Sequence, residues 1–160
     1  MSTVIYPGSF DPFHLGHLDV VEQAVQLFGD VVVAVMHNPQ KPSGQFTADE
    51  RVDMITASVA KLPSVRVQAF SGLAIDAAEA VKASCIVKGL RTPADFEVEQ
   101  QMAHTNYTVS GIRTVYVPCA PALGFISSRF IREISAHGGD VSSMVPSAVS
   151  KVLQAHHKRS

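Results

Sequence analysis

The feature that most constrains the fold is an unbroken apolar run at residues 31–36, Val-Val-Val-Ala-Val-Met. A strand with one face in water alternates apolar and polar residues, whereas this run leaves no face for solvent. Such runs are typical of parallel strands that helices cover on both sides. Shorter runs predict further strands at residues 3–6, 65–70, 85–87 and 114–117.

Apolar residues at helical spacing fill the segments between these runs. Leu18, Val21, Val25 and Phe28 recur on one helix face, and Gly29 is placed to end that helix. Further helices are expected near residues 47–62, 75–83, 97–107 and 127–137, and from about 147. Alternating strands and helices predict an α/β fold with a doubly wound parallel sheet. We expect one domain over residues 1–160, with a C-terminal helix and a short solvated tail from about residue 147.

Composition and charge argue against several classes of protein. The formal net charge is −1, so no global field attracts nucleic acid or acidic membranes. No segment has the roughly 18 uninterrupted apolar residues of a membrane span, and the N-terminal residues lack the pattern of a signal peptide. Cys85 and Cys119 are too far apart for a metal or redox motif. A cytoplasmic protein with reduced thiols is the simplest expectation.

The strongest functional signal is Tyr-Pro-Gly-Ser-Phe-Asp-Pro-Phe-His-Leu-Gly-His at residues 6–17. This segment joins the first strand to the first helix, so His14, Gly16 and His17 lie at a helix N-terminus. Backbone N–H groups and the helix dipole favour anions there, which predicts a nucleotide phosphate site. Two alternatives are a surface helix cap and a metal site from His14 and His17, although the sequence offers no third ligand at suitable spacing.

Cations follow two other predicted strands. Lys41 lies in the loop after the run at residues 31–36, while Lys88 and Arg91 flank Gly89 after the run at residues 85–87. Ligands of open α/β sheets bind beyond the carboxyl ends of strands, so these side chains could reach one cleft. An exposed lysine or arginine is also common on any soluble surface, and each signal alone is weak.

Two helix starts add polar groups to the candidate cleft. Glu99 lies near the start of one helix, where it could accept a hydrogen bond from a ribose or adenine. A second helix start carries two serines, of which one could cap the helix, and two arginines that could hold an anion. These four residues are Ser127, Ser128, Arg129 and Arg132.

Together these segments resemble the bacterial phosphopantetheine adenylyltransferases, a family of the nucleotidylyl transferase superfamily. The resemblance runs nearly end to end, and it implies a Rossmann-like nucleotidyltransferase fold. Its carriers are the segments 6–12 and 14–17 (the latter reading HxGH), Lys-Gly-Leu-Arg at 88–91, Asp-Phe-Glu at 95–97, Phe-Ile-Ser-Ser at 125–128 and Gly-Asp-Val at 139–141. HxGH alone occurs in many adenylyl and cytidylyl transferases, and the later segments narrow the resemblance to this one family.

The resemblance implies direct in-line transfer of the adenylyl group of ATP to 4′-phosphopantetheine. The products are dephospho-coenzyme A and pyrophosphate, in the penultimate step of coenzyme A synthesis. Mg²⁺ is expected on the ATP phosphates, with no protein ligands of its own assigned. The resemblance further implies a homohexamer that coenzyme A inhibits. No nucleic acid or membrane partner is expected.

The family's pattern gives catalytic roles to His17, Lys41 and Arg91, with His17 stabilising the charge that develops at the α-phosphate. His14 is expected to support the nucleotide instead. Residues expected to bind phosphopantetheine are Ser9, Lys41, Ala74 and Lys88. Residues expected to bind ATP are Ser9, Phe10, His17, Gly89, Leu90, Arg91, Glu99, Leu123, Gly124, Phe125, Ile126, Ser127, Ser128 and Arg129. Arg129 stands where the family usually has a small hydroxyl residue, and Leu123-Gly124 replaces a frequent aromatic-serine pair.

Other hypotheses share part of this pattern. Transfer to nicotinate mononucleotide or to a glycerol phosphate would use the same HxGH segment. A nucleotide-binding regulatory module without catalysis would bind ATP and release no pyrophosphate. Class I aminoacyl-tRNA synthetases have a similar signature, but this chain is too short for one and lacks an excess of basic residues for tRNA.

Overall fold

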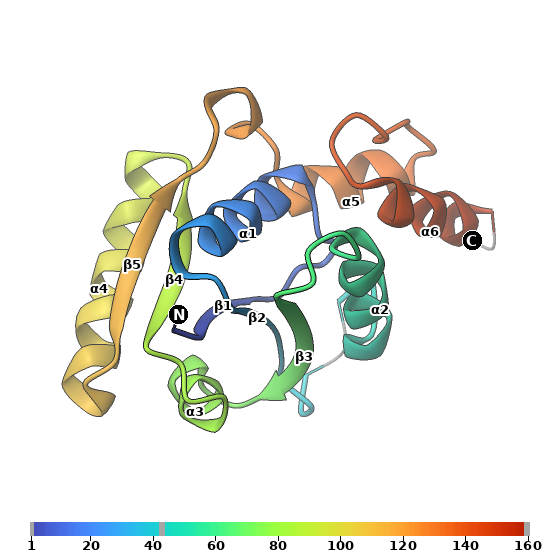
Figure 1. Ribbon diagram of the computed structural model, residues 1–160. Coiled ribbons are helices and arrows are strands. Elements are labelled where there is room, and N and C mark those ends of the chain that lie inside the picture. The colour runs from blue at the N-terminus through green and yellow to red at the C-terminus, as the bar shows by residue number, and fades with distance from the viewer. Residues whose placement is uncertain (1, 42–43, 159–160) are drawn as a thin grey trace.

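The protein is described by a computed structural model covering residues 2–41 and 44–158 (Figure 1). Strands and helices alternate along most of these residues, as the apolar pattern predicts. The strands are β1 (Val4–Gly8), β2 (Val31–His37), β3 (Val65–Ser71), β4 (Cys85–Leu90) and β5 (Arg113–Pro118). The helices are α1 (Leu15–Phe28), α2 (Ala48–Ser58), α3 (Ala74–Ala80), α4 (Pro93–Ser110), α5 (Ser128–Ala136) and α6 (Ser147–His157), with a 3₁₀ turn η1 (Pro121–Leu123) before α5.

All five strands are parallel and lie in the order β3-β2-β1-β4-β5. The chain runs outward from β1 through β2 to β3, then crosses back to β4 and continues to β5. The direction of winding therefore reverses between β1 and β4, which are neighbours. This confirms the predicted doubly wound α/β sheet and places a topological switch point beside the first strand.

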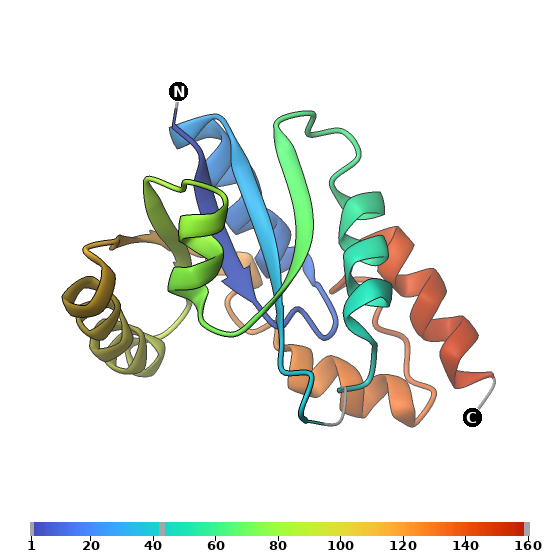
Figure 2. The same ribbon diagram turned by 90° about the horizontal axis from the view of Figure 1, so that it is seen from below.

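The apolar run in β2 is covered on both faces, as its sequence predicts. Val31, Val33 and Val35 join the larger core cluster, whereas Val32 and Ala34 point into the smaller one, and all five are fully buried. Helices α1, α2, α5 and α6 contribute to the larger cluster and α3 to the smaller. Figure 2 shows α3 in front of the strands, on the face opposite α1.

Helix α4 is longer than the sequence pattern suggests and packs only loosely. The Thr92 side chain accepts a hydrogen bond from the Asp95 amide, and Pro93 fits the first turn, so the helix begins before the predicted apolar face. It ends at Gly111, whose φ of 75° is left-handed. Helix α4 lies over β4 and β5 and has no buried residue among those described, since its apolar residues are few and scattered.

The C-terminal segment begins a helix where the sequence places one. Pro146 precedes α6, and Val149 and Leu153 pack one helix face into the larger core. Arg159 and Ser160 of the predicted tail lie outside the described residues. Among those described, no helix is both long and apolar enough to cross a bilayer.

Candidate active site

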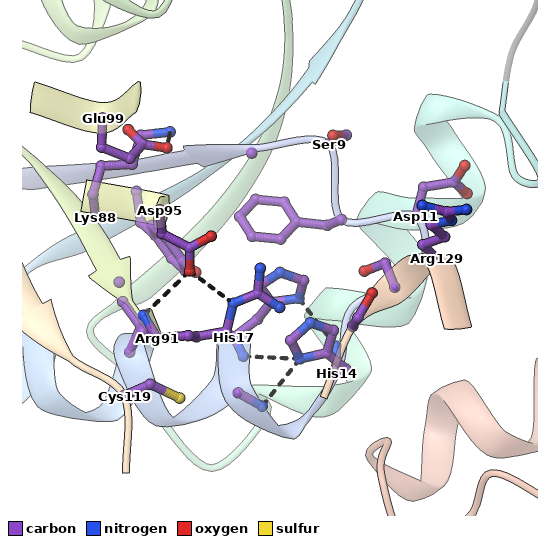
Figure 3. Close-up of a pocket in the computed structure, with 18 of the residues that line it drawn as sticks. Ser9, Asp11, His14, His17, Lys88, Arg91, Asp95, Glu99, Cys119 and Arg129 are labelled. Carbon is purple, nitrogen blue, oxygen red and sulfur yellow. Dashed lines mark hydrogen bonds and ion pairs between the residues drawn. The ribbon is translucent and has the colours of Figure 1, made fainter. Parts of the chain in front are cut away.

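A cavity of about 590 Å³ opens beyond the carboxyl ends of β1 and β4, at the switch point (Figure 3). Its walls come from the loop after β1, the first turn of α1, the end of β4, the first turns of α4 and the start of α5. Segments far apart in the sequence thus meet at the place where doubly wound sheets bind ligands.

The loop after β1 is tightly packed. Gly8 has no room for a side chain, because a Cβ there would lie 2.8 Å from Cζ of Phe10. The Phe10 ring is buried against Tyr6 and Phe13, and its backbone has a left-handed φ of 50°. A non-glycine residue with this φ is uncommon and persists where its surroundings hold it. The loop therefore presents a fixed backbone to the cavity.

His14 and His17 form a capping box at the start of α1. Nδ1 of His14 accepts hydrogen bonds from the amides of Gly16 and His17, and Nδ1 of His17 accepts one from the His14 amide. The two rings stack with centroids 3.6 Å apart. Because each Nδ1 is an acceptor, each neutral ring carries its proton on Nε2.

Both imidazoles favour the neutral form. Burial, together with the nearby Arg91 guanidinium, lowers the pKa of His14 to about 4. Burial, the neighbouring His14 and Arg91 lower the pKa of His17 well below its usual value. At neutral pH, His17 is consequently an uncharged Nε2–H donor at the cavity wall.

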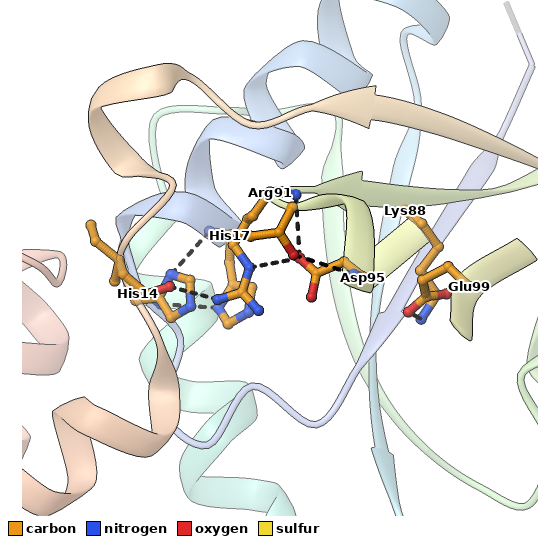
Figure 4. A network of polar contacts seen from close by, with 8 residues as sticks. His14, His17, Lys88, Arg91, Asp95 and Glu99 are labelled. Carbon is orange, nitrogen blue, oxygen red and sulfur yellow. Dashed lines mark hydrogen bonds and ion pairs between the residues drawn. The ribbon is translucent and has the colours of Figure 1, made fainter. Parts of the chain in front are cut away.

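Arg91 is held at the end of β4 by two other segments (Figure 4). Its Nε lies 3.2 Å from Oδ2 of Asp95, which also accepts from the Arg91 amide. One terminal nitrogen donates to the Ile126 carbonyl at 2.8 Å. The guanidinium is thereby oriented between α4 and the segment before α5, with donor capacity left for an anion.

Lys88 and Glu99 lie at the end of the cavity opposite Arg129 (Figure 3). The Lys88 ammonium is 3.6 Å from a Glu99 carboxylate oxygen, and the Tyr116 hydroxyl donates to the Glu99 carbonyl. Positive charge therefore lines both ends of the cavity, while carboxylates of α4 balance part of it. Such an arrangement suits a ligand that carries phosphate groups at two places.

Neither serine at the start of α5 caps the helix through its side chain. Ser127 is the N-cap residue by backbone geometry, yet its side chain makes no capping hydrogen bond, and it faces the cavity. The Ser128 hydroxyl instead donates to the Pro12 carbonyl at 2.8 Å. Arg132 reaches the same loop and donates to the Asp11 carbonyl at 2.7 Å. The helix start is thus fastened to the loop after β1.

The structure gathers many of the predicted site residues and leaves others outside. Those that line the cavity are Ser9, Phe10, His17, Lys88, Gly89, Arg91, Glu99, Ser127, Ser128 and Arg129. Those that do not line it are Lys41, Ala74, Leu90, Leu123, Gly124, Phe125 and Ile126. Lys41 is exposed on its loop, whereas Ile126 is buried and contributes the carbonyl that Arg91 binds.

Several lining residues were not predicted as site residues from the sequence. Tyr6 lies within β1 and Cys119 directly follows β5, whereas Asp11 lies in the loop after β1 and Asp95 in the first turn of α4. Asp11 accepts hydrogen bonds from the amides of Gln45 and Phe46, so it fastens the loop after β2. The acidic residues carry a usable signal, since each follows a strand end by a few positions.

The donor set does not resemble a protein metal site. Among the described residues, no group of three or more His, Cys, Asp or Glu side chains could hold a metal ion. Asp95 and Glu99 are paired with cations, and Asp11 is used by backbone amides.

Comparison with known proteins agrees with this architecture. Residues 5–134 match the cytidylyltransferase-like family. A provisionally assigned nicotinate-nucleotide adenylyltransferase from Vibrio parahaemolyticus superposes with a TM-score of 0.68 at 21% identity, covering 96% of this chain and 99% of the other. A lipopolysaccharide core biosynthesis protein from Thermoplasma volcanium gives a TM-score of 0.53 at 23% identity, covering 75% of this chain and 97% of the other. At these identities the two structures show a shared fold.

Proposed function

The chain belongs to the cytidylyltransferase-like family, and on that premise we propose that it transfers the adenylyl group of ATP to 4′-phosphopantetheine. The observation that carries the proposal is the cavity at the switch point. It combines the neutral His17 donor with cations from two further segments, the end of β4 and the start of α5. These are the HxGH, Lys-Gly-Leu-Arg and Ile-Ser-Ser segments that carry the family resemblance.

The proposed reaction needs no covalent enzyme intermediate. An oxygen of the acceptor phosphate attacks the α-phosphorus of ATP, and the bond from that phosphorus to the bridging β-oxygen breaks. Pyrophosphate leaves with the electron pair, and the new phosphoanhydride is dephospho-coenzyme A. Because the nucleophile is already an anion, no general base is required, and positioning and charge stabilisation supply the catalysis.

His17 is suited to the α-phosphate because it is neutral. Its Nε2–H can donate to a non-bridging oxygen whose charge grows in the transition state, and no proton has to be removed first. Ser9 lies on the adjoining loop and could add a hydroxyl donor. We assign to His17 the role of transition-state stabiliser rather than acid or base.

The cations divide the proposed site between two substrates. Arg91 and Arg129, with Ser127 and Ser128, would hold ATP, which enters with Mg²⁺ bound to its phosphates. Lys88 would hold the acceptor phosphate. Lys41 would approach it from the exposed loop after β2.

A line of apolar side chains favours an acceptor with an extended, weakly polar arm. Ala94 and Val98 line the cavity, and Met102 follows one turn later on the same helix face. Val98 and Met102 are 66% and 52% exposed, so they offer uncovered apolar surface beside Lys88. A pantetheine arm could cover this line, whereas a second nucleotide would present a polar ribose to it.

Transfer to nicotinate mononucleotide is the second candidate. It is favoured by the fold shared with the Vibrio parahaemolyticus structure over nearly the whole of both chains. That acceptor also carries a phosphate, so the same histidine and cations would serve it.

Pyrophosphate release separates these candidates. Purified protein with MgATP should release pyrophosphate when 4′-phosphopantetheine is added, and not with nicotinate mononucleotide or glycerol phosphate. Release with nicotinate mononucleotide alone would replace the first candidate with the second. ATP binding without release for any acceptor would contradict catalysis altogether.

Inhibition by coenzyme A and assembly into a hexamer also belong to the proposal, and both rest on the family resemblance alone. Competition of coenzyme A in the same assay tests the first, and sedimentation velocity tests the second.

A further inference from the structure

Arg51 is a buried cation that lies outside the cavity. It belongs to α2 and is 5% exposed. Its Nε donates to the Thr47 carbonyl at 3.2 Å, and one terminal nitrogen donates to the Ser9 carbonyl at 2.6 Å. Among the described residues, no Asp or Glu forms an ion pair with it. Burying an unpaired guanidinium is costly, so these carbonyls must compensate for lost hydration.

The same nitrogen also lies 3.4 Å from the Met36 carbonyl. Arg51 therefore bridges the carboxyl ends of β1 and β2 from behind the cavity. An arginine that only stabilised α2 would need no contact with Ser9, which lies on the loop that carries the candidate site.

The contact fixes the direction of a peptide group. In a trans peptide, the carbonyl of one residue and the N–H of the next point in opposite directions. Ser9 and Phe10 line the cavity and Arg51 does not, so holding the Ser9 carbonyl toward Arg51 directs the Phe10 N–H toward the cavity. Within the described residues, this N–H has no backbone or side-chain acceptor.

A backbone N–H that faces a cavity and has no hydrogen-bond acceptor can bind an anion there. We infer that Arg51 is a positioning residue, which aims the Phe10 N–H at a phosphate oxygen of the bound nucleotide. This inference rests on the proposed function for the identity of the nucleotide. Arg51 would then contribute to binding of the nucleotide although it does not line the cavity.

The left-handed backbone of Phe10 supports this reading. Its φ of 50° is unfavourable for a phenylalanine and would relax if the preceding carbonyl were released. Arg132 and Ser128 hold two later carbonyls of the loop, those of Asp11 and Pro12, from the cavity side. Arg51 is the contact that holds Ser9 from the opposite side.

Binding of ATP to the Arg51→Lys variant tests the inference. Lysine keeps the charge, but one ammonium group cannot serve the Thr47 and Ser9 carbonyls together. We expect the Kd for ATP, measured by calorimetry, to rise about tenfold, which corresponds to one charge-assisted hydrogen bond. The KM for the acceptor should change less than twofold. Unchanged ATP affinity in a folded variant would overturn the inference.

Two controls separate positioning from general loosening of α2. Ile55→Val removes one buried methyl group from the same helix, and Arg66→Lys makes the same exchange at an exposed site. Both should bind ATP like the wild type. If Ile55→Val weakened binding as much as Arg51→Lys, the role of Arg51 would be structural only.

A measurement on the unmodified chain does not depend on any variant folding. Labelling with ¹⁵N-phenylalanine gives eight amide signals, and the Phe10 signal can be assigned from Phe10→Tyr. Titration with ATP, and with pyrophosphate as a simpler probe, should move the Phe10 proton downfield. An unmoved signal at saturation would contradict the inference, even if the acceptor assay succeeded. A moved signal with no acceptor-dependent turnover would contradict only the proposed function.

Discussion

At the scale of single residues, the central feature is a histidine kept neutral in order to donate. The capping interactions of His14 and His17 turn both Nδ1 atoms toward the backbone, and burial disfavours a second proton. A neutral donor does not bind a ground-state phosphate as strongly as a cation does. Its hydrogen bond to a phosphate oxygen can still strengthen as negative charge develops in the transition state. Such strengthening lowers the activation barrier of the transfer.

His17→Ala should lower kcat about 10²- to 10³-fold, the usual effect of removing one preorganised donor to developing charge. The KM for ATP should change little, because other groups hold the nucleotide. Steady-state kinetics with saturating acceptor provide the measurement. His137→Ala, at an exposed site that does not line the cavity, is the matched control and should leave kcat unchanged. A His17 variant with wild-type turnover would remove this residue from the mechanism.

The lowered pKa values also predict how stability depends on pH. The usual value is 6.5, and the folded pKa of His14 is about 4. As the pH falls below 6.5, these imidazoles therefore bind protons in the unfolded chain but not in the folded chain. The free energy of unfolding is highest above that pH and declines below it, by up to about 1.4 kcal/mol per pH unit for each imidazole.

Urea unfolding between pH 7 and pH 5 measures this decline. His14→Asn keeps a side chain that can cap α1 and removes one titrating group. Its stability should fall less steeply over this interval than that of the wild type. Equal slopes for His14→Asn and the wild type would show that burial of His14 does not shift its titration.

At the scale of elements, the first turns of three helices supply or orient most of the polar groups of the site. Helix α1 presents the histidines, α4 orients Arg91 through Asp95, and α5 is tied to the loop after β1 by Ser128 and Arg132. Helix α4 is the least firmly packed of these, so its first turn depends on the cap at Thr92.

Thr92→Ala should destabilise the first turn of α4 and loosen Asp95. A lost N-cap costs about 1 kcal/mol, and here the cost should appear as faster hydrogen exchange at residues 95–97 with a small change in global stability. The KM for ATP should rise severalfold, because Arg91 loses its orientation. Thr108→Ala, an exposed position later in the same helix whose hydroxyl donates to the His104 carbonyl, is the control. Equal exchange rates in both variants would contradict the importance of this cap.

The sequence predicts elements well where one local pattern decides them. The run in β2, the start of α2 near residue 47 and the Gly29 end of α1 all occur as expected. It does less well where tertiary contacts decide. Ser128 is a plausible cap by its position, but it bonds to Pro12 across the site. Nothing in the sequence distinguishes Arg51 from the other charged residues of α2, and only the packing of α2 against two strand ends buries it.

At the scale of the whole molecule, the strand order explains why the site exists. The sheet reverses direction between β1 and β4, so the loops that follow these strands diverge and leave a cavity between them. The sequence places cations after strands, but not the distances between them. In the structure, Lys88 and Arg91 line the cavity. Lys41 lies on an exposed loop and Ala74 is the first residue of α3, and neither of them lines the cavity.

In the proposed reaction, the adenylyl group of ATP moves to 4′-phosphopantetheine in this cavity. Following the label from [α-³²P]ATP tests it most directly, with the products separated by chromatography. Label should appear in dephospho-coenzyme A, the released pyrophosphate should be unlabelled, and His17→Ala should slow the formation of both products together. Label found in free AMP, or in the adenylylated product of another acceptor in place of dephospho-coenzyme A, would contradict it.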